Sequence, residues 1–247
     1  MKLSLITVTY NCENTLEDTF KSVKEQKCSN LEYIVIDGGS NDRTVEIIEK
    51  YRDIITFWSS SPDEGIYDAM NKGLKKTSGD YVGFLHADDT FFSSVTLSEV
   101  MSELREHKPD VLYGDLEYVN STDISRVIRR WKSCAFSSAL LSKGWMPPHP
   151  TLYVKRSVIR HTGLFDTTYR IAADYDYILR LFTQKGLKFL YLPVVIVKMR
   201  IGGASNKSIS NIILKSKEDI RALRKNGVGG IYTLIRKNIS KIPQFFK

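Results

Sequence analysis

The chain has 247 residues and a mass of 28.2 kDa, which suits one large α/β domain or two small ones with a sizeable buried core. Hydrophobic residues make up 42% and charged residues 26% of the sequence, so the composition excludes fibrous and disordered proteins. Cys12, Cys28 and Cys134 are too few and too scattered for a disulfide framework or a zinc site, and they fit a reducing compartment. No stretch reaches the roughly 18 apolar residues that span a bilayer, and the N-terminus does not resemble a signal peptide. We therefore expect a cytoplasmic protein.

The charge is distributed unevenly along the chain. The formal net charge is +8, and residues 200–247 contain 11 Lys and Arg against 2 Asp and Glu, a net charge of +9. Residues 1–199 are close to neutral at −1. A near-neutral body argues against nucleic acid bound across the main domain. The basic C-terminal part leaves open a contact with phosphate or with an anionic membrane surface.

Strand and helix patterns alternate through the first 90 residues. The expected strands are Leu3–Thr9, Leu31–Ile36, Ile54–Trp58 and Tyr81–Leu85, and the expected helices are Glu13–Gln26, Thr44–Tyr51 and Ile66–Lys76. This order implies right-handed crossovers and a largely parallel sheet, so the fold class is α/β, Rossmann-like and flanked by helices. Ligands of such sheets gather at the carboxyl ends of the strands.

The order beyond residue 95 is less regular. The patterns predict a helix over Leu97–His107, strands over Val111–Tyr118 and Ser125–Trp131, and a Pro-rich loop over Gly144–Pro150. They further predict a helix over Ala173–Gln184, a strand, turn and second strand over Lys188–Met199, and a basic helix over Asn206–Lys225. No linker separates two domains.

Three acidic clusters lie where a cleft would form. Asp37 ends the second strand, Asp88 and Asp89 follow the fourth, and Asp174 and Asp176 begin a later helix. Each alone is explained by turn formation or helix capping. Two adjacent carboxylates after an apolar strand repel one another unless a cation or water lies between them. Their oxygen atoms suit Mn²⁺ or Mg²⁺, and these ions in turn suit a diphosphate.

Five segments resemble glycosyltransferase family 2 in their order and spacing. They are Thr7-Val8-Thr9-Tyr10-Asn11, residues 36–44 (IDGGSNDRT), residues 63–73 (DEGIYDAMNKG), residues 79–85 (GDYVGFL) and His86-Ala87-Asp88-Asp89. The resemblance is strong over residues 1–92 and weaker to about residue 205. It implies the GT-A fold in residues 1–205, with a nucleotide-sugar-binding half (1–92) and an acceptor half (93–205). Residues 206–247 would form a basic C-terminal helical tail.

The resemblance also implies roles for single residues around a nucleotide-sugar donor, most often a UDP-sugar. Asp37 would bind the base, and Asp88 would lie near the ribose and the metal. Asp89 would bind Mn²⁺ or Mg²⁺ at the diphosphate, as a carboxylate that faces the solvent in the cleft. Family members frequently have an acidic residue where this chain has His86, which leaves the number of protein ligands open. The other expected donor-binding residues are Thr7, Thr9, Tyr10, Asp63, Asn71 and Lys72.

The implied reaction inverts the configuration at the anomeric carbon and needs a carboxylate base to deprotonate the attacking hydroxyl. The divalent metal would stabilise the charge on the leaving nucleoside diphosphate. Family members usually place an acidic pair at the start of the later helix, and the second residue of the pair is the base. Here the pair is Ala173-Asp174, so Asp174 is the expected base. Asp176 is the competing candidate, and it is otherwise a residue of the first helical turn that the helix dipole favours.

The function expected from the sequence is that of an inverting, metal-dependent glycosyltransferase that modifies a saccharide or lipid-linked saccharide in cell-surface polysaccharide or glycolipid assembly. A non-catalytic binding module for sugar nucleotides or glycans is the alternative. A dinucleotide-dependent oxidoreductase is disfavoured because no G-x-G-x-x-G turn follows the first strand. The basic tail predicts a peripheral contact with the inner face of the membrane, or else a solvated helix that caps the domain.

Three further residues have open roles. His149 either borders the acceptor pocket or is a structural loop histidine, and Trp145 either stacks on a sugar or is a core or lid tryptophan. Arg200, with the turn after it, is a candidate for a flap over the diphosphate.

Overall fold

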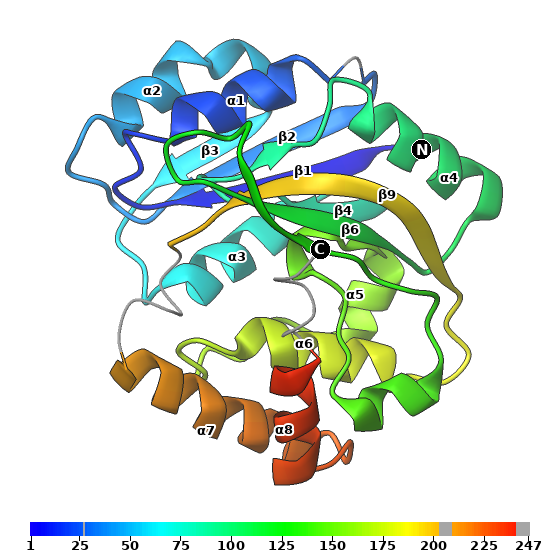
Figure 1. Ribbon diagram of the computed structural model, residues 1–247. Helices are drawn as coiled ribbons and strands as arrows, with labels where there is room; N and C mark the ends of the chain where they lie inside the picture. The colour runs from blue at the N-terminus through cyan, green and yellow to red at the C-terminus, as the bar shows by residue number, and fades with distance from the viewer. Residues whose placement is uncertain (27, 203–208, 241–247) are drawn as a thin grey trace.

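A single nine-stranded sheet runs through the centre of the molecule in the computed structural model, which describes residues 1–26, 28–202 and 209–240 (Figure 1). The strand order is β3-β2-β1-β4-β8-β6-β9-β5, and β7 pairs with β6. Helices α1, α2 and α4 cover one face of the sheet, and α3, α5 and α6 cover the other (Figure 1). Each face therefore has its own apolar core layer.

The N-terminal half is the parallel part of the sheet, as its alternating pattern predicts. All seven residues of β1 are buried, as expected for a central strand that is covered on both faces. The predicted strand at Ile54–Trp58 is partly wrong, because a short 3-10 turn occupies Arg52–Ile54 and the strand begins at Phe57. The elements are β1 (Leu3–Thr9), α1 (Leu16–Lys24), β2 (Leu31–Asp37), α2 (Thr44–Lys50), η1 (Arg52–Ile54), β3 (Phe57–Ser60), α3 (Ile66–Leu74) and β4 (Tyr81–Phe84).

The second half continues the same sheet. Strand β8 lies antiparallel to both β4 and β6 and so joins the two halves, while β6 and β9 run parallel. The elements are β5 (Thr90–Phe91), α4 (Thr96–His107), β6 (Val111–Val119), β7 (Val127–Trp131), η2 (Ser138–Lys143), η3 (His149–Thr151), β8 (Tyr153–Lys155), α5 (Arg156–Thr162), α6 (Ala173–Phe182) and β9 (Phe189–Arg200). The sequence patterns did not predict β5, β8 or α5, which are short.

The predicted strand, turn and strand over Lys188–Met199 is wrong, since β9 is one strand of 12 residues. Tyr113 pairs with Tyr191 and Asp115 with Val195, so three residues of β9 lie opposite Gly114. Pro193 falls in this irregularity, where its missing N–H costs no regular ladder hydrogen bond. Pro193 therefore predicts a turn from the sequence, although β9 continues past it.

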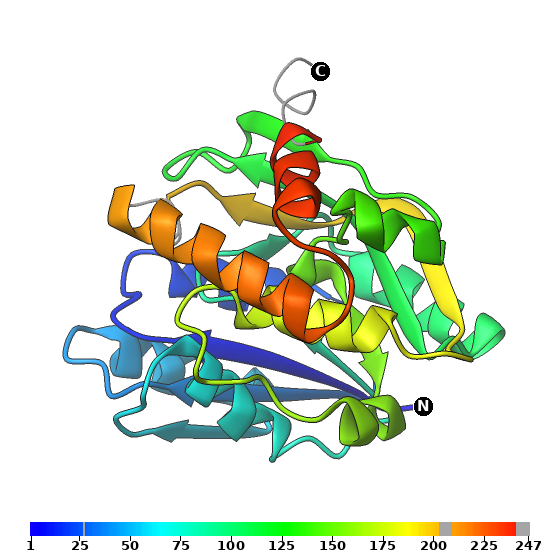
Figure 2. The same cartoon turned by 90° about the horizontal axis from the view of Figure 1, so that it is seen from below.

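The C-terminal segment forms two helices that pack on the second half of the domain. Helix α7 (Ile209–Lys225) lies across α6, and α8 (Ile231–Ile239) contacts α7 and η2 (Figure 2). The side chains of Ala222, Leu223 and Leu234 are buried in the core layer below the sheet. The predicted tail is helical and basic, but it is part of the packed body; residues 206–208 and 241–247 lie outside the described part. None of the described helices is long and apolar enough to cross a membrane.

Candidate active site

A cleft of about 1010 Å³ opens at the carboxyl ends of β1, β2 and β4. This is the edge at which parallel sheets bind ligands. Thr9 ends β1 and Tyr10 follows it, Asp63 precedes α3, and Asp88 follows β4, so four of the predicted donor-binding residues line one cleft. Tyr10 is 59% exposed and offers a free ring face. The sequence did not single out Cys12, Asn14, Thr15, Pro62 or Ile66, which line the same cleft.

The loop after β2 is shaped by the buried carboxylate of Asp37. One of its oxygens accepts hydrogen bonds from the backbone N–H groups of Gly39 (3.1 Å) and Ser40 (2.9 Å) and from the Ser60 hydroxyl (2.6 Å). The other accepts one from the Ser40 hydroxyl. Gly39 has φ +82°, a left-handed conformation that favours glycine. Asp37 therefore fixes the loop that borders the cleft, and its contact with a base stays a prediction.

Three other predicted donor-binding residues do not line the cleft. The buried Thr7 hydroxyl lies 2.8 Å from the Tyr33 hydroxyl and donates to the carbonyl of Leu85 (2.7 Å). The Asn71 side chain bonds both the backbone N–H and the carbonyl of Phe165, each at 2.9 Å. These contacts indicate structural roles.

Lys72, the third of them, is held beside the entrance of the cleft. Its ammonium group donates to the carbonyl of Pro62 (3.1 Å) and pairs with Asp68 (3.1 Å). Since Pro62 itself lines the cleft, Lys72 supports the wall of the cleft from behind.

The two adjacent carboxylates after β4 face different surroundings. Asp88 is half-buried and lines the cleft, whereas Asp89 is fully buried and does not. The expectation that Asp89 faces the solvent is therefore wrong. Burial, and then the neighbouring charge of Asp88, raise the pKa of the Asp89 carboxyl well above its usual range. Because β5 begins at Thr90, the chain turns back into the sheet at Asp89, which leaves Asp88 at the surface of the cleft.

Arg200 holds this segment in place. Its guanidinium donates to the carbonyl of Asp88 (2.8 Å), to the carboxylate of Asp18 (2.6 Å) and to the carbonyl of Ser121 (3.1 Å). The buried guanidinium of Arg200 thus donates its hydrogen bonds to groups within the protein. These contacts do not support the predicted role of Arg200 in a flap over the diphosphate. Most of the turn after it lies outside the described residues.

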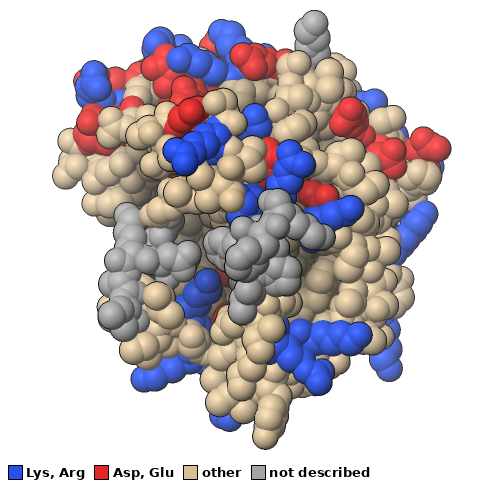
Figure 3. Space-filling model, viewed as in Figure 1, with Lys and Arg blue, Asp and Glu red and all other residues tan. Residues whose placement is uncertain are grey.

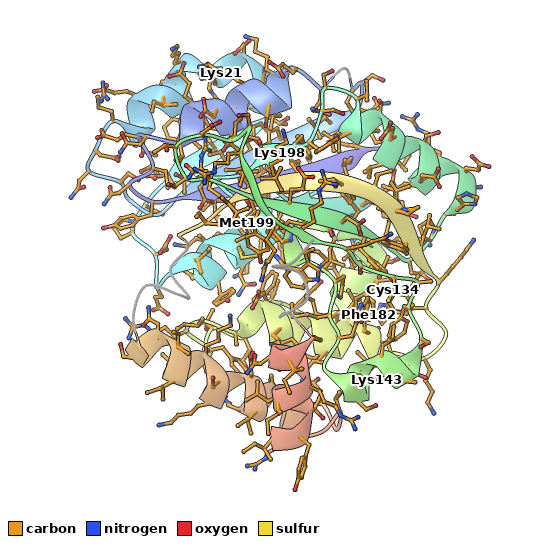
Figure 4. All side chains as sticks on the ribbon, in the orientation of Figure 1. Lys21, Cys134, Lys143, Phe182, Lys198 and Met199 are labelled. Atoms are coloured by element: carbon orange, nitrogen blue, oxygen red, sulfur yellow. The ribbon has the colours of Figure 1, made fainter. Side chains whose placement is uncertain are left out.

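A second pocket of about 160 Å³ adjoins the cleft, and His86 lines both. The imidazoles of His86 and His149 stack with 6.1 Å between their centres, so His149 does border this pocket. Burial lowers the pKa of His86 and lowers that of His149 to about 3, so the His149 ring is neutral. Trp131 lines the pocket, as does Met199 of β9 (Figure 4).

Asp174, the predicted base, lines this second pocket from the first turn of α6. One carboxylate oxygen accepts a hydrogen bond from the backbone N–H of Tyr175 (2.8 Å) and lies 3.4 Å from the Tyr67 hydroxyl. The other oxygen is left for a ligand, within the part of the chain that the structure describes. The position of the carboxylate suits removal of a proton from a hydroxyl in the pocket.

Asp176, the competing candidate, is fully buried and lines neither space. Its carboxylate pairs with Arg180 (2.8 Å) and Lys225 (3.4 Å) and accepts a hydrogen bond from Asn226 (3.1 Å). It is therefore more than the simple first-turn residue considered from the sequence, because it connects α6 to α7.

Helices α7 and α8 supply residues of the second pocket that the sequence did not predict. Lys215, Asp219 and Lys237 line it, and the buried Lys237 pairs with Asp219 (2.8 Å) above the ring of Tyr175. Burial lowers the pKa of Lys237. No local pattern marks these residues, since they come from helices far along the chain from Asp174.

The carboxylate of Glu218 on α7 holds the loop before α6. It accepts hydrogen bonds from the backbone N–H groups of Arg170 (2.8 Å), Ile171 (2.8 Å) and Ala172 (2.9 Å). The loop thereby gains an anionic cap at the start of the helix, where backbone N–H groups lack partners. Ile171 and Ala172 line the second pocket, so Glu218 fixes the backbone next to Asp174.

Comparisons with known proteins agree with this geometry. The sequence pattern of "Glycosyl transferase family 2" matches residues 4–181. The "PGL/p-HBAD biosynthesis glycosyltransferase" of Mycobacterium bovis is 31% identical over 217 residues, which cover 86% of this chain and 82% of that protein. The poly(ribitol-phosphate) β-N-acetylglucosaminyltransferase TarS of Staphylococcus aureus is 31% identical over 129 residues, or 50% of this chain and 22% of TarS.

Solved structures share the fold. TarS residues 1–349 in complex with UDP-GlcNAc superpose with a TM-score of 0.72 at 20% identity, covering 92% of this chain and 66% of that one. The mannosyltransferase PcManGT of Pyrobaculum calidifontis, in complex with GDP-Man and Mn²⁺, superposes with a TM-score of 0.68 at 17% identity. The superposition covers 98% of this chain and 70% of PcManGT. The chain spans 39% of a longer TarS structure. These similarities confirm the predicted GT-A fold.

Proposed function

Because the chain belongs to glycosyl transferase family 2 and is a glycosyltransferase, we propose that it transfers the sugar of a UDP-sugar to an acceptor hydroxyl, with inversion at the anomeric carbon. One observation carries this proposal: a cleft with Asp88 and a pocket with Asp174 meet at His86. Donor and acceptor can thus approach one another from two sides. The TarS complexes with UDP-GlcNAc and UDP support a UDP-sugar as the donor.

The residues present fit a divalent metal at the donor diphosphate. Mg²⁺ is usually held by one or two carboxylates together with substrate phosphates, and Asp88 provides one carboxylate in the cleft. Within the described residues no group of three or more His, Cys, Asp or Glu could hold a metal by itself, so donor oxygens would complete its shell. When bound, Mn²⁺ or Mg²⁺ would stabilise the negative charge on the departing diphosphate.

The side chains divide the remaining work. Asp174 accepts the proton of the acceptor hydroxyl while the oxygen of that hydroxyl forms the bond to the anomeric carbon. The bond from that carbon to the diphosphate oxygen breaks, and UDP leaves with the electron pair. Asp37 and Arg200 hold the loops that border the donor, and the walls of the second pocket orient the acceptor.

We expect the Asp88→Asn protein to lose metal-dependent donor binding and transfer. In the unaltered protein, UDP at 100 times its dissociation constant with Mn²⁺ adds about 2.7 kcal/mol of stability. For a chain of this size that raises the melting temperature by roughly 5–10 °C. A thermal-shift series with UDP or GDP, with and without Mn²⁺, measures this effect in both proteins.

Asp53→Asn is the matched control, because Asp53 is a surface carboxylate that pairs with Lys24 (2.7 Å) away from the cleft. It should keep the full shift. An undiminished shift or full transfer activity in EDTA, or in the Asp88→Asn protein, contradicts the metal assignment. A shift with GDP and none with UDP contradicts the proposed donor.

The proposed setting is the cytoplasmic face of a membrane, where a saccharide or lipid-linked saccharide is the acceptor. The charged side chains over α7 and α8, at the bottom of the view, are mainly Lys and Arg, whereas the opposite side carries Asp and Glu mixed with Lys and Arg (Figure 3). Ile231, Ile235 and Ile239 are exposed and follow one another at helical spacing on α8, and Tyr232 beside them is 81% exposed. Basic residues near an anionic bilayer gain about 1 kcal/mol each, and exposed apolar side chains can enter the interface.

Replacing both Tyr232 and Ile235 by serine should therefore weaken binding to anionic vesicles several-fold. Co-sedimentation with vesicles of anionic or of zwitterionic lipid measures this binding. The control replaces Val127 and Ile128, which are exposed on β7, by serine. Equal pelleting with both lipids, or equal loss in the control, rejects the membrane contact. Deleting residues 229–247 would not test the membrane contact by itself, because the deletion also removes the buried side chains of Leu234 and Lys237.

A further inference from the structure

The second pocket is lined by charged side chains of both signs. Two carboxylates line it, Asp174 and Asp219, together with the cations Lys215 and Lys237. The His149 ring is neutral, because burial lowers its pKa to about 3. Asp219 and Lys237 neutralise one another through their ion pair of 2.8 Å, which leaves one base and one lysine for ligands.

Lys215 is the cation that is available. It forms no ion pair with any residue that the structure describes, and its side chain is half-buried at the wall of the pocket. Lys215, Glu218 and Asp219 lie at spacings of three and four on α7, so they share one helix face. Glu218 and Asp219 are buried against the acceptor half, and Lys215 is therefore turned toward the pocket rather than toward the solvent.

The pair of Asp219 and Lys237 forms a rigid polar wall beside Lys215. The Lys237 ammonium lies 3.2 Å from the centre of the Tyr175 ring, and both charged side chains are buried. The second carboxylate oxygen of Asp219, Oδ1, is buried and has no hydrogen-bond partner among the described residues. A buried polar atom of this kind is costly unless a ligand completes it, and an acceptor hydroxyl can donate to it.

We propose that helices α7 and α8 form an acceptor subsite for a sugar that bears a negatively charged group, in which Lys215 binds the anion and Asp219 Oδ1 accepts a hydroxyl hydrogen. The anion is a phosphate or a carboxylate, since lysine binds either as a point charge. Asp174 carries a negative charge in the same pocket, so an anionic acceptor needs a cation there to balance it. This inference rests on the proposed function, because it assigns the second pocket to the acceptor.

Lysine footprinting tests the subsite without relying on catalysis. The protein is treated with an amine-reactive reagent in the presence of methyl β-glucoside, glucuronate or glucose 6-phosphate, with and without UDP and Mn²⁺, and the modified lysines are identified by mass spectrometry. We expect Lys215 to be protected several-fold by one or both anionic sugars and not by the neutral one. Lys217 is exposed on another face of α7 and should react equally in every sample.

The substitution Lys215→Met keeps much of the length and removes the charge. A hydrogen bond to a charged group contributes about 1.5–3 kcal/mol, so calorimetric affinity for the protecting sugar should fall roughly 10- to 150-fold. Lys217→Met should bind as the unaltered protein does. The two anions separate a phosphate site from a carboxylate site, because the one that protects Lys215 more strongly identifies the group.

Three results overturn the subsite: equal protection by the neutral sugar, protection by none of the three, and unchanged affinity in the Lys215→Met protein. If Lys215 instead only balances the charge of Asp174, its replacement shifts the pH profile of turnover equally for charged and neutral acceptors. The proposed function fails separately, when UDP with Mn²⁺ neither raises the melting temperature nor supports transfer. The modification of Lys215 in the samples without UDP does not depend on donor binding, so it tests the subsite even when the proposed function fails.

Discussion

Replacement of Asp174 by asparagine is expected to lower transfer by roughly 10²- to 10⁴-fold, the usual contribution of a positioned general base. Asparagine keeps the size of the side chain and can accept the hydrogen bond that Tyr175 N–H donates at 2.8 Å. It cannot accept the proton of the acceptor hydroxyl. Donor affinity should stay near normal, because Asp174 lines the second pocket and not the donor cleft. Calorimetry with UDP and turnover with an accepted saccharide measure the two effects.

Asp176→Asn is the matched comparison and should show the opposite behaviour. The buried carboxylate of Asp176 binds Arg180, Lys225 and Asn226, so its loss weakens the attachment of α6 to α7. We expect a loss of roughly 1.5–3 kcal/mol of stability, typical of a hydrogen bond to a charged group. Turnover of the folded protein should change far less than in Asp174→Asn. An active Asp174→Asn protein beside an inactive but folded Asp176→Asn protein reverses the assignment.

The cleft at the carboxyl ends of β1, β2 and β4 could be predicted from the sequence because its geometry is local. Parallel strands place the residues that follow them at one edge: Thr9 and Tyr10 lie at the end of β1, and Asp88 lies in the turn between β4 and β5. The choice between Asp88 and Asp89 was not predictable in this way. The chain turns between β4 and β5, where the Asp89 N–H donates to the His86 carbonyl (3.0 Å). Which of the two carboxylates faces the cleft therefore depends on this turn and on how β5 pairs with β9.

The second pocket could not be predicted because its residues are far apart along the chain. Trp131 on β7, Asp174 on α6, and Lys215 and Lys237 on the C-terminal helices meet in one pocket only after the whole domain has packed. Trp145, the tryptophan considered from the sequence, and Trp131, which was not considered, illustrate this limit. Trp145 packs edge-to-face on Phe182, which Figure 4 labels on α6, so it belongs to the core, whereas Trp131 lines the pocket. Nothing in the sequence around either residue distinguishes the two.

The C-terminal segment shows most clearly what packing adds to composition. Its basic residues and mixed aromatics predict a surface tail, and the exposed side of α8 keeps that character. The buried side of α7 in the same segment holds Glu218, which accepts hydrogen bonds from three successive backbone N–H groups beside the predicted base. The segment is therefore needed for the geometry of the site, whether or not it contacts a membrane.

Replacement of Glu218 by glutamine should accordingly reduce turnover although Glu218 does not line either space. The amide keeps one acceptor oxygen but turns N–H donors toward the backbone N–H groups of Ile171 and Ala172, so the loop must shift. Asp174 follows this loop by two residues, and a displacement of about 1 Å at a reacting group can cost up to 100-fold in rate. We expect a fall in kcat of roughly 10- to 100-fold with little change in the KM for the donor.

A purely structural role for Glu218 makes a different prediction. Leu234→Ala removes a buried side chain of α8 and should cost about 2–5 kcal/mol of stability, at least as much as Glu218→Gln, without touching the loop. Measured well below both melting temperatures, Leu234→Ala should keep its kcat while Glu218→Gln does not. Equal kcat in the two proteins would mean that Glu218 stabilises the fold without positioning Asp174. Since the donor cleft lies on the far side of His86, an increase in donor KM that matches the loss of rate would likewise place the effect outside the loop before α6.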